Sequence, residues 1–254
     1  MKVYPVVHVQ SPEQAVEQTR VAVDAGADGV FLINHGMATG HDLMSDPLID
    51  AFNDVTDTFG DLYVGINYLS YDPLSGYEYT QKLLDQHAIH RAPDALWFDD
   101  ATDRIINVDT AKKYLGELKH LRDDDPRLQA IRFLGGVSFK YTSTYSEDPV
   151  KSAQLAAEYA PYIDVVTTSG AGTGSAPSSQ KISAMKHAIT GRTLAVASGV
   201  SEHNIQSYNG DIDEVLIASS LETGTYSGIF IPERVKRFVA AAHGQHGVSA
   251  DSVK

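Results

Sequence analysis

Residues 163–222 read IDVVTTSGAGTGSAPSSQKISAMKHAITGRTLAVASGVSEHNIQSYNGDIDEVLIASSLE, and this stretch decides the fold. It holds three short, mostly apolar segments, 163–168, 193–198 and 215–219, and each is followed by glycine or small polar residues. Short apolar runs of this kind are typical of parallel strands that are buried on both faces. The residues between them have helical periodicity, so the stretch predicts consecutive βα units.

The same alternation extends through the rest of the chain. Strand-like segments also occur at 3–9, 29–34, 62–68, 95–99 and 131–138. Helix starts carry a capping Ser or Asp, often followed by Pro, because the cap accepts from free N–H groups and Pro has no N–H to leave unpaired. The expected starts are Ser11-Pro12, Asp46-Pro47, Asp148-Pro149, Ser178, Ser201 and Pro232.

Eight such units without a break in composition predict a single closed (β/α)8 barrel, the TIM-barrel fold, over residues 1–243. An open doubly wound sheet is the alternative, but that fold gathers its glycines and polar residues at one switch point, whereas here they follow every strand. Between strands four and five, the helical segment 109–121 and the acidic run 123–126 predict a small helical insertion with a solvated loop. Residues 244–254 lack an apolar period and are expected to form a flexible tail.

The composition excludes several classes of function. The 254 residues carry 33 acidic and 20 basic side chains, a formal net charge of −13, which argues against binding to nucleic acid or to an anionic membrane surface. No apolar run is long enough for a transmembrane helix or a cleaved signal, and the default expectation is a cytoplasmic protein. The acidic excess fits either a well-solvated surface or adaptation to high salt.

Polar residues at the carboxyl ends of the strands are the candidates for the site, because ligands bind there in a barrel. Asn34 and His35 end strand two, Asn67 ends strand three, Asp99 ends strand four, and Lys140 follows strand five. Asp99, Lys140 and His35 are the candidate catalytic residues. Asn34 and Asn67 suit hydrogen bonds to a substrate.

Each catalytic candidate allows more than one role. Lys140 is able to form a Schiff base, to neutralise a ligand phosphate, to pair with Asp99, or to serve structure alone. Asp99 suits a general base or a ligand of a substrate hydroxyl, and His35 suits acid–base chemistry because a histidine ordinarily titrates near neutral pH. His8 and His41 do not complete with His35 a set of three or four convergent metal ligands, so we expect no metal and no cofactor.

The last three loops of the barrel predict an anion site. Backbone N–H groups in such loops, and the N-terminus of a following helix, favour negative charge, and glycine lets the backbone close on phosphate oxygens. The expected contacts come from Gly170, Gly172, Thr173 and Gly174 after strand six, Ser198 and Gly199 after strand seven, and Ser219 and Ser220 after strand eight. Glu222 would repel a phosphate, so we expect it either to orient a sugar hydroxyl or to face solvent.

The same third of the chain resembles the BtpA/SgcQ family of barrel proteins. The matching positions are Thr168, Gly170, Gly174, Pro177, Ser198, Gly199, Asn204 and Ser220. The openings VVHVQSPEQA and DAGADGVFLINH look like more distant versions of the first two strands of the family. Where the family usually has a Pro-rich HLPPLPGSP-like loop and an acidic-Asn pair, this chain has Ile33-Asn34-His35.

The resemblance implies the barrel and the anion site rather than a reaction. Members of the family are associated with photosystem I assembly or stability, or occur among sugar-utilisation proteins. The loops after strands seven and eight also look like the phosphate-binding loops of phosphoribosylanthranilate isomerase and thiamine phosphate synthase. The catalytic acid and base of those enzymes are not recognisable in this sequence.

Two functions from different classes are consistent with these features. The first is an enzyme that acts on a sugar phosphate or phosphoribosyl compound by isomerisation, lyase or glycosidic-bond chemistry. The second is a non-catalytic binding or assembly protein that keeps the barrel and its anion site. In both cases the expected ligand is a small phosphorylated compound, and self-association into a homo-oligomer stays open.

Overall fold

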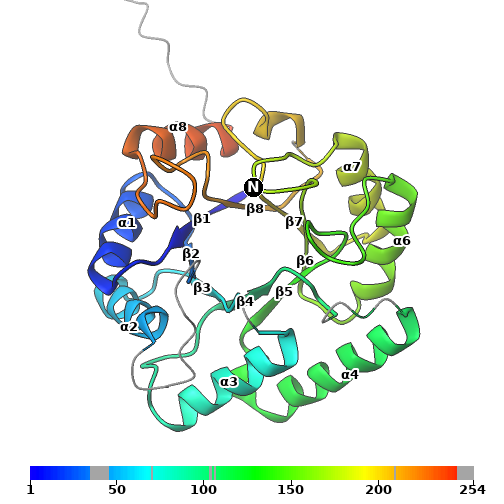
Figure 1. The fold of residues 1–254 in the computed structure, drawn as a ribbon, viewed down its shortest axis with the longest axis horizontal. Helices are drawn as coiled ribbons and strands as arrows, with labels where there is room; N and C mark the ends of the chain where they lie inside the picture. The colour runs from blue at the N-terminus through cyan, green and yellow to red at the C-terminus, as the bar shows by residue number, and fades with distance from the viewer. Residues whose placement is uncertain (35–45, 70, 103–104, 106, 209, 245–254) are drawn as a thin grey trace, which may run out of the picture.

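The computed structural model describes residues 1–34, 46–69, 71–102, 105, 107–208 and 210–244. Eight parallel strands close into a barrel in sequence order, and helices surround it (Figure 1). The strands are β1 (Lys2–His8), β2 (Val30–Ile33), β3 (Val64–Asn67), β4 (Ala95–Phe98), β5 (Arg132–Gly136), β6 (Val165–Thr168), β7 (Thr193–Ala197) and β8 (Glu214–Ile217). The predicted TIM barrel is therefore confirmed, and the open doubly wound alternative is excluded because β1 pairs with both β2 and β8.

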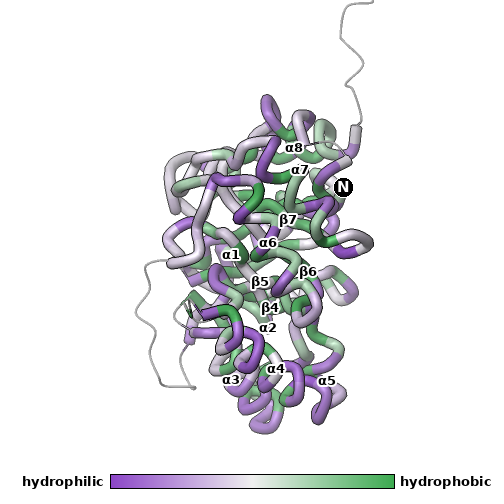
Figure 2. The backbone as a smooth tube through the Cα atoms, turned by 90° about the vertical axis from the view of Figure 1, so that its right-hand side faces the viewer, coloured by the Kyte–Doolittle hydropathy of each residue, from purple (hydrophilic) through white to green (hydrophobic). Residues whose placement is uncertain are grey.

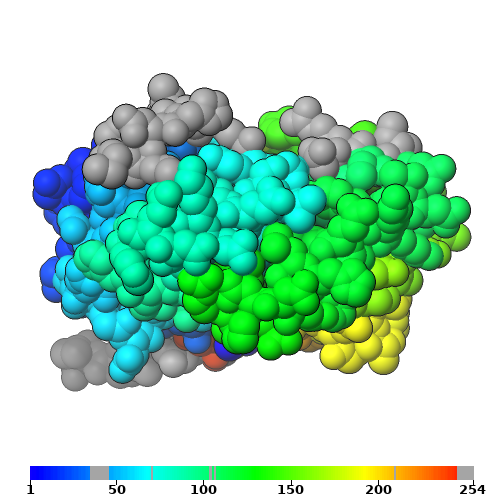
Figure 3. Space-filling view, turned by 90° about the horizontal axis from the view of Figure 1, so that it is seen from below, coloured from blue at the N-terminus to red at the C-terminus, as the bar shows by residue number. Residues whose placement is uncertain are grey.

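Eight α-helices lie within the described residues. They are α1 (Pro12–Asp24), α2 (Pro47–Phe59), α3 (Pro73–Asp85), α4 (Val108–Asp124), α5 (Pro126–Gln129), α6 (Pro149–Tyr159), α7 (Ser179–Ala188) and α8 (Pro232–Ala242). Seen from below the view of Figure 1, residues of α3 and α4 form a continuous outer surface (Figure 3). Hydrophilic residues are frequent along α3, α4 and α5 at the periphery (Figure 2).

The capping residues read from the sequence begin the helices as expected. Ser11, Asp46, Asp148 and Ser178 all accept hydrogen bonds from backbone N–H groups in the first turns of α1, α2, α6 and α7. Asp72 does the same for α3, which also has Pro in its first turn. These caps fix where each helix begins after its loop, and thus how long each loop at the carboxyl end of the barrel is.

Two local predictions are wrong. No α-helix follows Ser201: the seventh unit contains only a 3-10 helix, η1 (Ile205–Tyr208), because the side chain of Asn204 holds the preceding residues in a turn. The acidic run 123–126 is not a loop either, since α4 continues to Asp124 and Asp125 caps the four-residue helix α5. That short helix is the insertion expected between strands four and five.

The core has two layers, as the alternation of side chains along each strand requires. One set of buried side chains, including Val6, Phe31, Trp97 and Leu216, fills the inside of the barrel. The other fills the space between the strands and the helices. No helix of the described residues is long and apolar enough to span a lipid bilayer.

The amino end of the barrel is closed by polar and aromatic side chains. Arg132 at the start of β5 donates to Glu214 at the start of β8 at 2.9 Å and to the Tyr63 hydroxyl at 3.0 Å. The ring of Tyr63 stacks on that of Tyr4, with the centroids 5.0 Å apart. Because this end is filled, a ligand reaches the interior from the opposite end.

Candidate functional site

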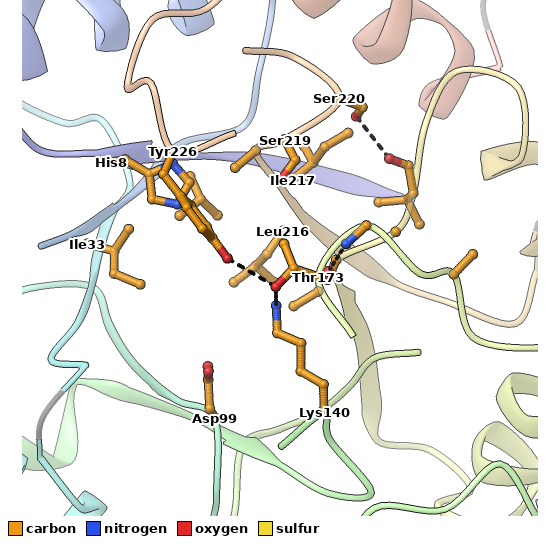
Figure 4. A pocket seen from close by; sticks show the side chains of 18 of the residues that line it. His8, Ile33, Asp99, Lys140, Thr173, Leu216, Ile217, Ser219, Ser220 and Tyr226 are labelled. Carbon is orange, nitrogen blue, oxygen red and sulfur yellow. Dashed lines mark hydrogen bonds between the residues drawn. The ribbon is translucent and has the colours of Figure 1, made fainter. Parts of the chain in front are cut away.

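A cavity of about 620 Å³ lies at the carboxyl ends of the strands, where the barrel fold predicts it (Figure 4). Apolar side chains from inside the barrel line its deepest part, among them Val6, Ile33, Trp97 and Leu216. Polar groups from several different strands and loops line the rest. This combination of an apolar base and a few converging polar groups is typical of small-molecule sites.

Asp99 and Lys140 form one wall of this cavity. Burial raises the pKa of Asp99, and the nearby Lys140 ammonium opposes that rise. Burial likewise lowers the pKa of Lys140, opposed by Asp99 and Tyr141. Burial thus favours the neutral form of both groups, a kind of pKa shift that is frequent at functional sites.

A second cavity, of about 480 Å³, adjoins the first and shares Asp99 and Lys140 with it. Asn67, at the end of β3, lines this second cavity and donates to Asp99 Oδ1 at 3.4 Å. Asn67 therefore contacts the catalytic candidate rather than the main cavity. The two cavities together extend the accessible space from the loops after β7 and β8 toward the ends of β3 and β4.

Thr173, in the glycine-rich loop after β6, connects three parts of the site. Lys140 Nζ donates to its hydroxyl at 3.4 Å, and the Tyr226 hydroxyl shares a hydrogen bond with the same oxygen at 3.1 Å (Figure 4). The backbone N–H of Thr173 donates to the Tyr141 hydroxyl at 3.1 Å. The loop after β6 is therefore fixed over the cavity by side chains from the loops after β5 and β8.

The loops after β7 and β8 present unused backbone donors beside the cavity. Within the described part of the chain, no hydrogen bond uses the backbone N–H groups of Gly199, Val200, Ser219 or Ser220. All four residues line the cavity. Convergent backbone N–H groups of this kind bind anions without requiring a positive side chain.

Local bonds hold the loop after β7 in the required shape. Asn204 accepts from the Ser201 N–H at 2.8 Å and donates to the Gly199 carbonyl at 2.9 Å. Gly199 has φ of +75°, and a side chain there would approach the backbone of Ser175 to 2.1 Å. Glycine is needed at this position both for its backbone conformation and for the close approach of the loop after β6.

Four non-glycine residues near the carboxyl ends of the strands have positive φ angles, namely Ser138, Tyr141, Ser198 and Tyr226. A positive φ costs free energy for a residue with a side chain, and such strain is common at functional sites. Tyr141, Ser198 and Tyr226 all line the cavity.

The predicted site residues do not all lie at the cavity. Those that line it are Asp99, Lys140, Thr173, Gly174, Ser198, Gly199, Ser219 and Ser220. Asn34 is buried next to β2 and does not line it, and His35 and His41 lie outside the described residues. Gly170 and Gly172 do not line it either: a Cβ on Gly170 would lie 2.3 Å from the Ser175 carbonyl oxygen, so this glycine permits loop packing.

The structure shows two groups of polar residues near the cavity that the sequence did not predict. His8 lines the cavity, and its Nδ1 lies 2.6 Å from the buried carboxylate of Glu222, so the expectation that Glu222 faces solvent is wrong. Lys181 on α7 is fully buried and donates to the carbonyls of Ser138 and Ser169. The contact between His8 and Glu222 could have been predicted from barrel closure, because closure places β1 next to β8.

No three His, Cys, Asp or Glu side chains of the described residues converge in a way that could hold a metal ion. The polar groups at the cavity are instead a carboxylate, an ammonium, an imidazole, hydroxyls and backbone N–H groups. Such groups bind anions and transfer protons.

The sequence of this barrel matches the model of a known protein family. The model of the BtpA family matches residues 10–244, which is nearly the whole chain. The chain belongs to the BtpA family. The match extends from the residues just before α1 through α8, and β1 precedes it. No curated protein sequence matches this chain.

Solved structures with the same fold as this BtpA-family protein include several enzymes. Phosphoribosyl anthranilate isomerase from Thermus thermophilus matches with a TM-score of 0.61 and 13% identity, over 97% of this chain and 100% of that one. Geranylgeranylglyceryl phosphate synthase from Thermoplasma acidophilum, solved with sn-glycerol-1-phosphate, matches with a TM-score of 0.61 and 12% identity, over 95% and 92%. Orotidine 5′-phosphate decarboxylase from Pyrococcus horikoshii matches with a TM-score of 0.62 and 10% identity, over 95% and 99%. At these identities the similarity shows the fold.

Proposed function

We propose that this BtpA-family protein is an enzyme that binds a sugar phosphate or phosphoribosyl compound and converts it by acid–base chemistry. Isomerisation, lyase and glycosidic-bond reactions all fall within that chemistry. The phosphate lies against the loops after β7 and β8, and the reacting end of the ligand extends toward Asp99 and Lys140.

One observation carries the proposal: the unused N–H groups of Gly199, Val200, Ser219 and Ser220 lie beside the same cavity that Asp99 and Lys140 line. Backbone donors stabilise a phosphate in any protonation state, and a remote phosphate fixes the position of the rest of the ligand. The similar barrels named above are consistent with this reading, since their names refer to phosphorylated compounds.

The distribution of exposed apolar side chains favours an enzyme over an assembly factor. Leu69 and Tyr141, two of the large apolar residues that are exposed among the described ones, line the two cavities. Of the others, Val23 on α1 and Ile229 after β8 lie on neighbouring parts of the barrel, whereas Val150 lies at the start of α6, so the exposed apolar side chains of the described residues do not all belong to one patch. A docking surface for a partner protein requires a contiguous patch.

Thermal unfolding in the presence of ligands tests the proposed function. Ribose 5-phosphate, phosphoribosyl pyrophosphate and hexose phosphates are compared with their unphosphorylated counterparts at constant ionic strength. A ligand present at a hundred times its Kd stabilises the folded state by about 2.7 kcal/mol, which raises the midpoint clearly. We expect a shift that requires the phosphate group.

Ser219→Asp with Ser219→Asn as its control locates the binding site. Both side chains have the same size, but only the carboxylate repels a phosphate at the loop after β8. We expect the shift to disappear in Ser219→Asp and to persist in Ser219→Asn. Equal shifts in the two variants, or no shift with any phosphorylated compound, would refute the proposal.

A further inference from the structure

His8 lines the cavity on the side opposite to Asp99 and Lys140 (Figure 4), and it forms a buried pair with Glu222. His8 ends β1, and Glu222 lies in the loop after β8, so closure of the barrel brings them together. His8 Nδ1 lies 2.6 Å from Glu222 Oε1, and the two residues are 5% and 1% exposed. The sequence separation of 214 residues shows that the contact depends on the complete fold.

The loop after β8 is built so that Glu222 keeps its position. Gly228 N–H donates to Glu222 Oε1 at 3.2 Å, and Arg234 on α8 donates to the Glu222 carbonyl at 2.7 Å. Glu222 also pairs with Phe230 in an isolated antiparallel bridge. The carboxylate is therefore held by the loop at the position where it contacts the imidazole of His8.

A carboxylate at Nδ1 determines the protonation pattern of the histidine. Ionised Glu222 only accepts hydrogen bonds, so Nδ1 of His8 carries a proton and donates. The neutral ring then has its proton-accepting lone pair on Nε2. A carboxylate in this position also fixes the orientation of the ring, as it does for histidines in metal and hydrolase sites.

His8 has a defined relation to the other polar groups of the cavity. Its ring packs edge-on against Tyr226, with the centroids 5.1 Å apart. The Tyr226 hydroxyl shares a hydrogen bond with the Thr173 hydroxyl, and Lys140 also donates to that hydroxyl. A ligand in the cavity thus has an imidazole on one side and an ammonium with a carboxylate on the other.

We propose that His8 is the proton-transfer base of this site, positioned by Glu222, and that the substrate is an aldose or ketose phosphate with a free carbonyl. The inference rests on the proposed function. His8 takes the proton from the carbon beside the carbonyl; the C–H electron pair becomes the C=C bond of an enediolate, and the carbonyl oxygen receives the negative charge. The protonated ring then returns the proton to the former carbonyl carbon. The hydroxyl on the adjacent carbon loses its proton and becomes the new carbonyl, and that proton passes to the enediolate oxygen, whose negative charge Lys140 stabilises in the intermediate.

Exchange of a carbon-bound proton with solvent tests this role without knowledge of the product. The protein is incubated with ribose 5-phosphate or ribulose 5-phosphate in D2O, and loss of the C1 and C2 proton signals is followed by NMR. His8→Asn keeps a donor for Glu222 but has no basic nitrogen, so we expect the exchange rate to fall by about 100-fold or more. Glu222→Gln keeps an acceptor for His8 but lacks the charge, and we expect a fall of about 10-fold to 100-fold.

Two further measurements separate catalysis from structure. The phosphate-dependent shift of the unfolding midpoint should be the same in His8→Asn, Glu222→Gln and the wild type, because neither residue supplies one of the backbone N–H groups proposed to bind the phosphate. His187→Asn, which changes an exposed histidine on α7, should leave the exchange rate unchanged. In protein with 15N-labelled histidine, His8 should show the tautomer with the proton on Nδ1.

The outcomes distinguish this inference from the proposed function. If no phosphorylated compound shifts the midpoint, the proposed function fails and this inference fails with it. If the sugar phosphates bind but exchange no carbon-bound proton, if His8→Asn exchanges at the wild-type rate, or if His8 carries its proton on Nε2, only the role of His8 is overturned.

Discussion

Asp99 shows at the scale of a single residue how function and stability oppose each other in this barrel. Its carboxylate lies at the end of β4, accepts from Asn67 and lies close to Lys140, yet burial still raises its pKa. In the folded state Asp99 thus binds its proton more tightly than in the unfolded chain. The free energy of unfolding therefore falls as the pH rises from about 4, the ordinary value, through the raised pKa.

Asp99→Asn should lower turnover and raise stability at neutral pH. Loss of a general acid or base costs about 100-fold to 10,000-fold in rate, whereas ligand binding through the anion loops should persist. The unfolding midpoint at pH 7 should exceed that of the wild type, because the buried charge is gone, and the difference should vanish below pH 4. Full activity of the variant, or a midpoint difference that does not depend on pH, would contradict this account of Asp99.

The sequence predicted single residues of the site better than it predicted pairs. Asp99 could be found because it directly follows β4, and Lys140 because it lies in the loop after β5; the carboxyl ends of barrel strands and the loops that follow them surround the ligand site. The pairing of His8 with Glu222 was missed because it requires the closure of β8 onto β1 and the conformation of the loop between β8 and α8. Asn34 was misplaced because one residue beyond a strand is enough to move a side chain from the cavity to the wall.

At the scale of elements, α7 supports the loops of two neighbouring strands through Lys181. Its buried ammonium donates to Ser138, after β5, at 2.8 Å and to Ser169, after β6, at 2.7 Å. It also lies 4.8 Å from the centre of the Tyr145 ring. Burial lowers the pKa of Lys181 to about 8, a shift that Glu147 opposes.

Lys181→Met should destabilise the fold by roughly 1–3 kcal/mol, because carbonyl groups lose a buried donor. The wild type should also gain stability as the pH rises from about 8 to about 10, since over that range the unfolded chain binds more protons at this lysine than the folded state does. Urea unfolding at several pH values measures both effects. Lys151→Met, at an exposed position of α6, serves as the control and should be nearly neutral; a similar loss in both variants would contradict the role of Lys181.

Gly199 joins the loops after β6 and β7, and a pair of substitutions isolates that contact. Gly191 and Gly199 both have positive φ, +78° and +75°, but a side chain at Gly191 meets nothing within 4 Å, whereas one at Gly199 meets Ser175 at 2.1 Å. Gly191→Ala should cost about 1 kcal/mol for the backbone conformation alone. Gly199→Ala should cost more in urea unfolding and should also abolish the phosphate-dependent midpoint shift; equal costs with binding intact would refute the contact.

The elements themselves were predicted well where capping chemistry marks them. Asp46 and Asp148 begin α2 and α6 as expected, and Asp72-Pro73 carries the same signal for α3. The seventh helix was mispredicted because the bonds of the Asn204 side chain favour a turn over a helix, and such side-chain competition leaves no periodic signal. The acidic run before Pro126 was misjudged because Arg127 stabilises Asp125 at the start of α5.

At the scale of the whole molecule, the excess of acidic over basic residues is the dominant electrostatic feature. The net charge of −13 causes self-repulsion in the compact state, and salt screens it over about 10 Å at 0.1 M. We expect the unfolding midpoint to rise steadily from low salt to molar KCl. A midpoint that is constant or falls over this range would show that the acidic surface is only a means of solubility.

The overall topology was predictable because eight repetitions of one pattern constrain it more than any single segment does. A parallel sheet with helical cover and with glycine or polar residues after every strand has few solutions, and a closed barrel is one of them. What the pattern does not contain is the set of contacts between loops, such as Thr173 with Tyr226 and Tyr141. Those contacts decide the shape of the cavity, and therefore the ligand.

The most direct test of the central claim is a crystal structure of the protein with ribose 5-phosphate. We predict phosphate oxygens within about 3 Å of the backbone nitrogens of Gly199, Val200, Ser219 and Ser220, with the sugar directed toward Asp99 and Lys140. A phosphate bound elsewhere, for example beside Arg234 and Arg237 on α8, or a cavity that stays empty at a saturating concentration, would contradict the account.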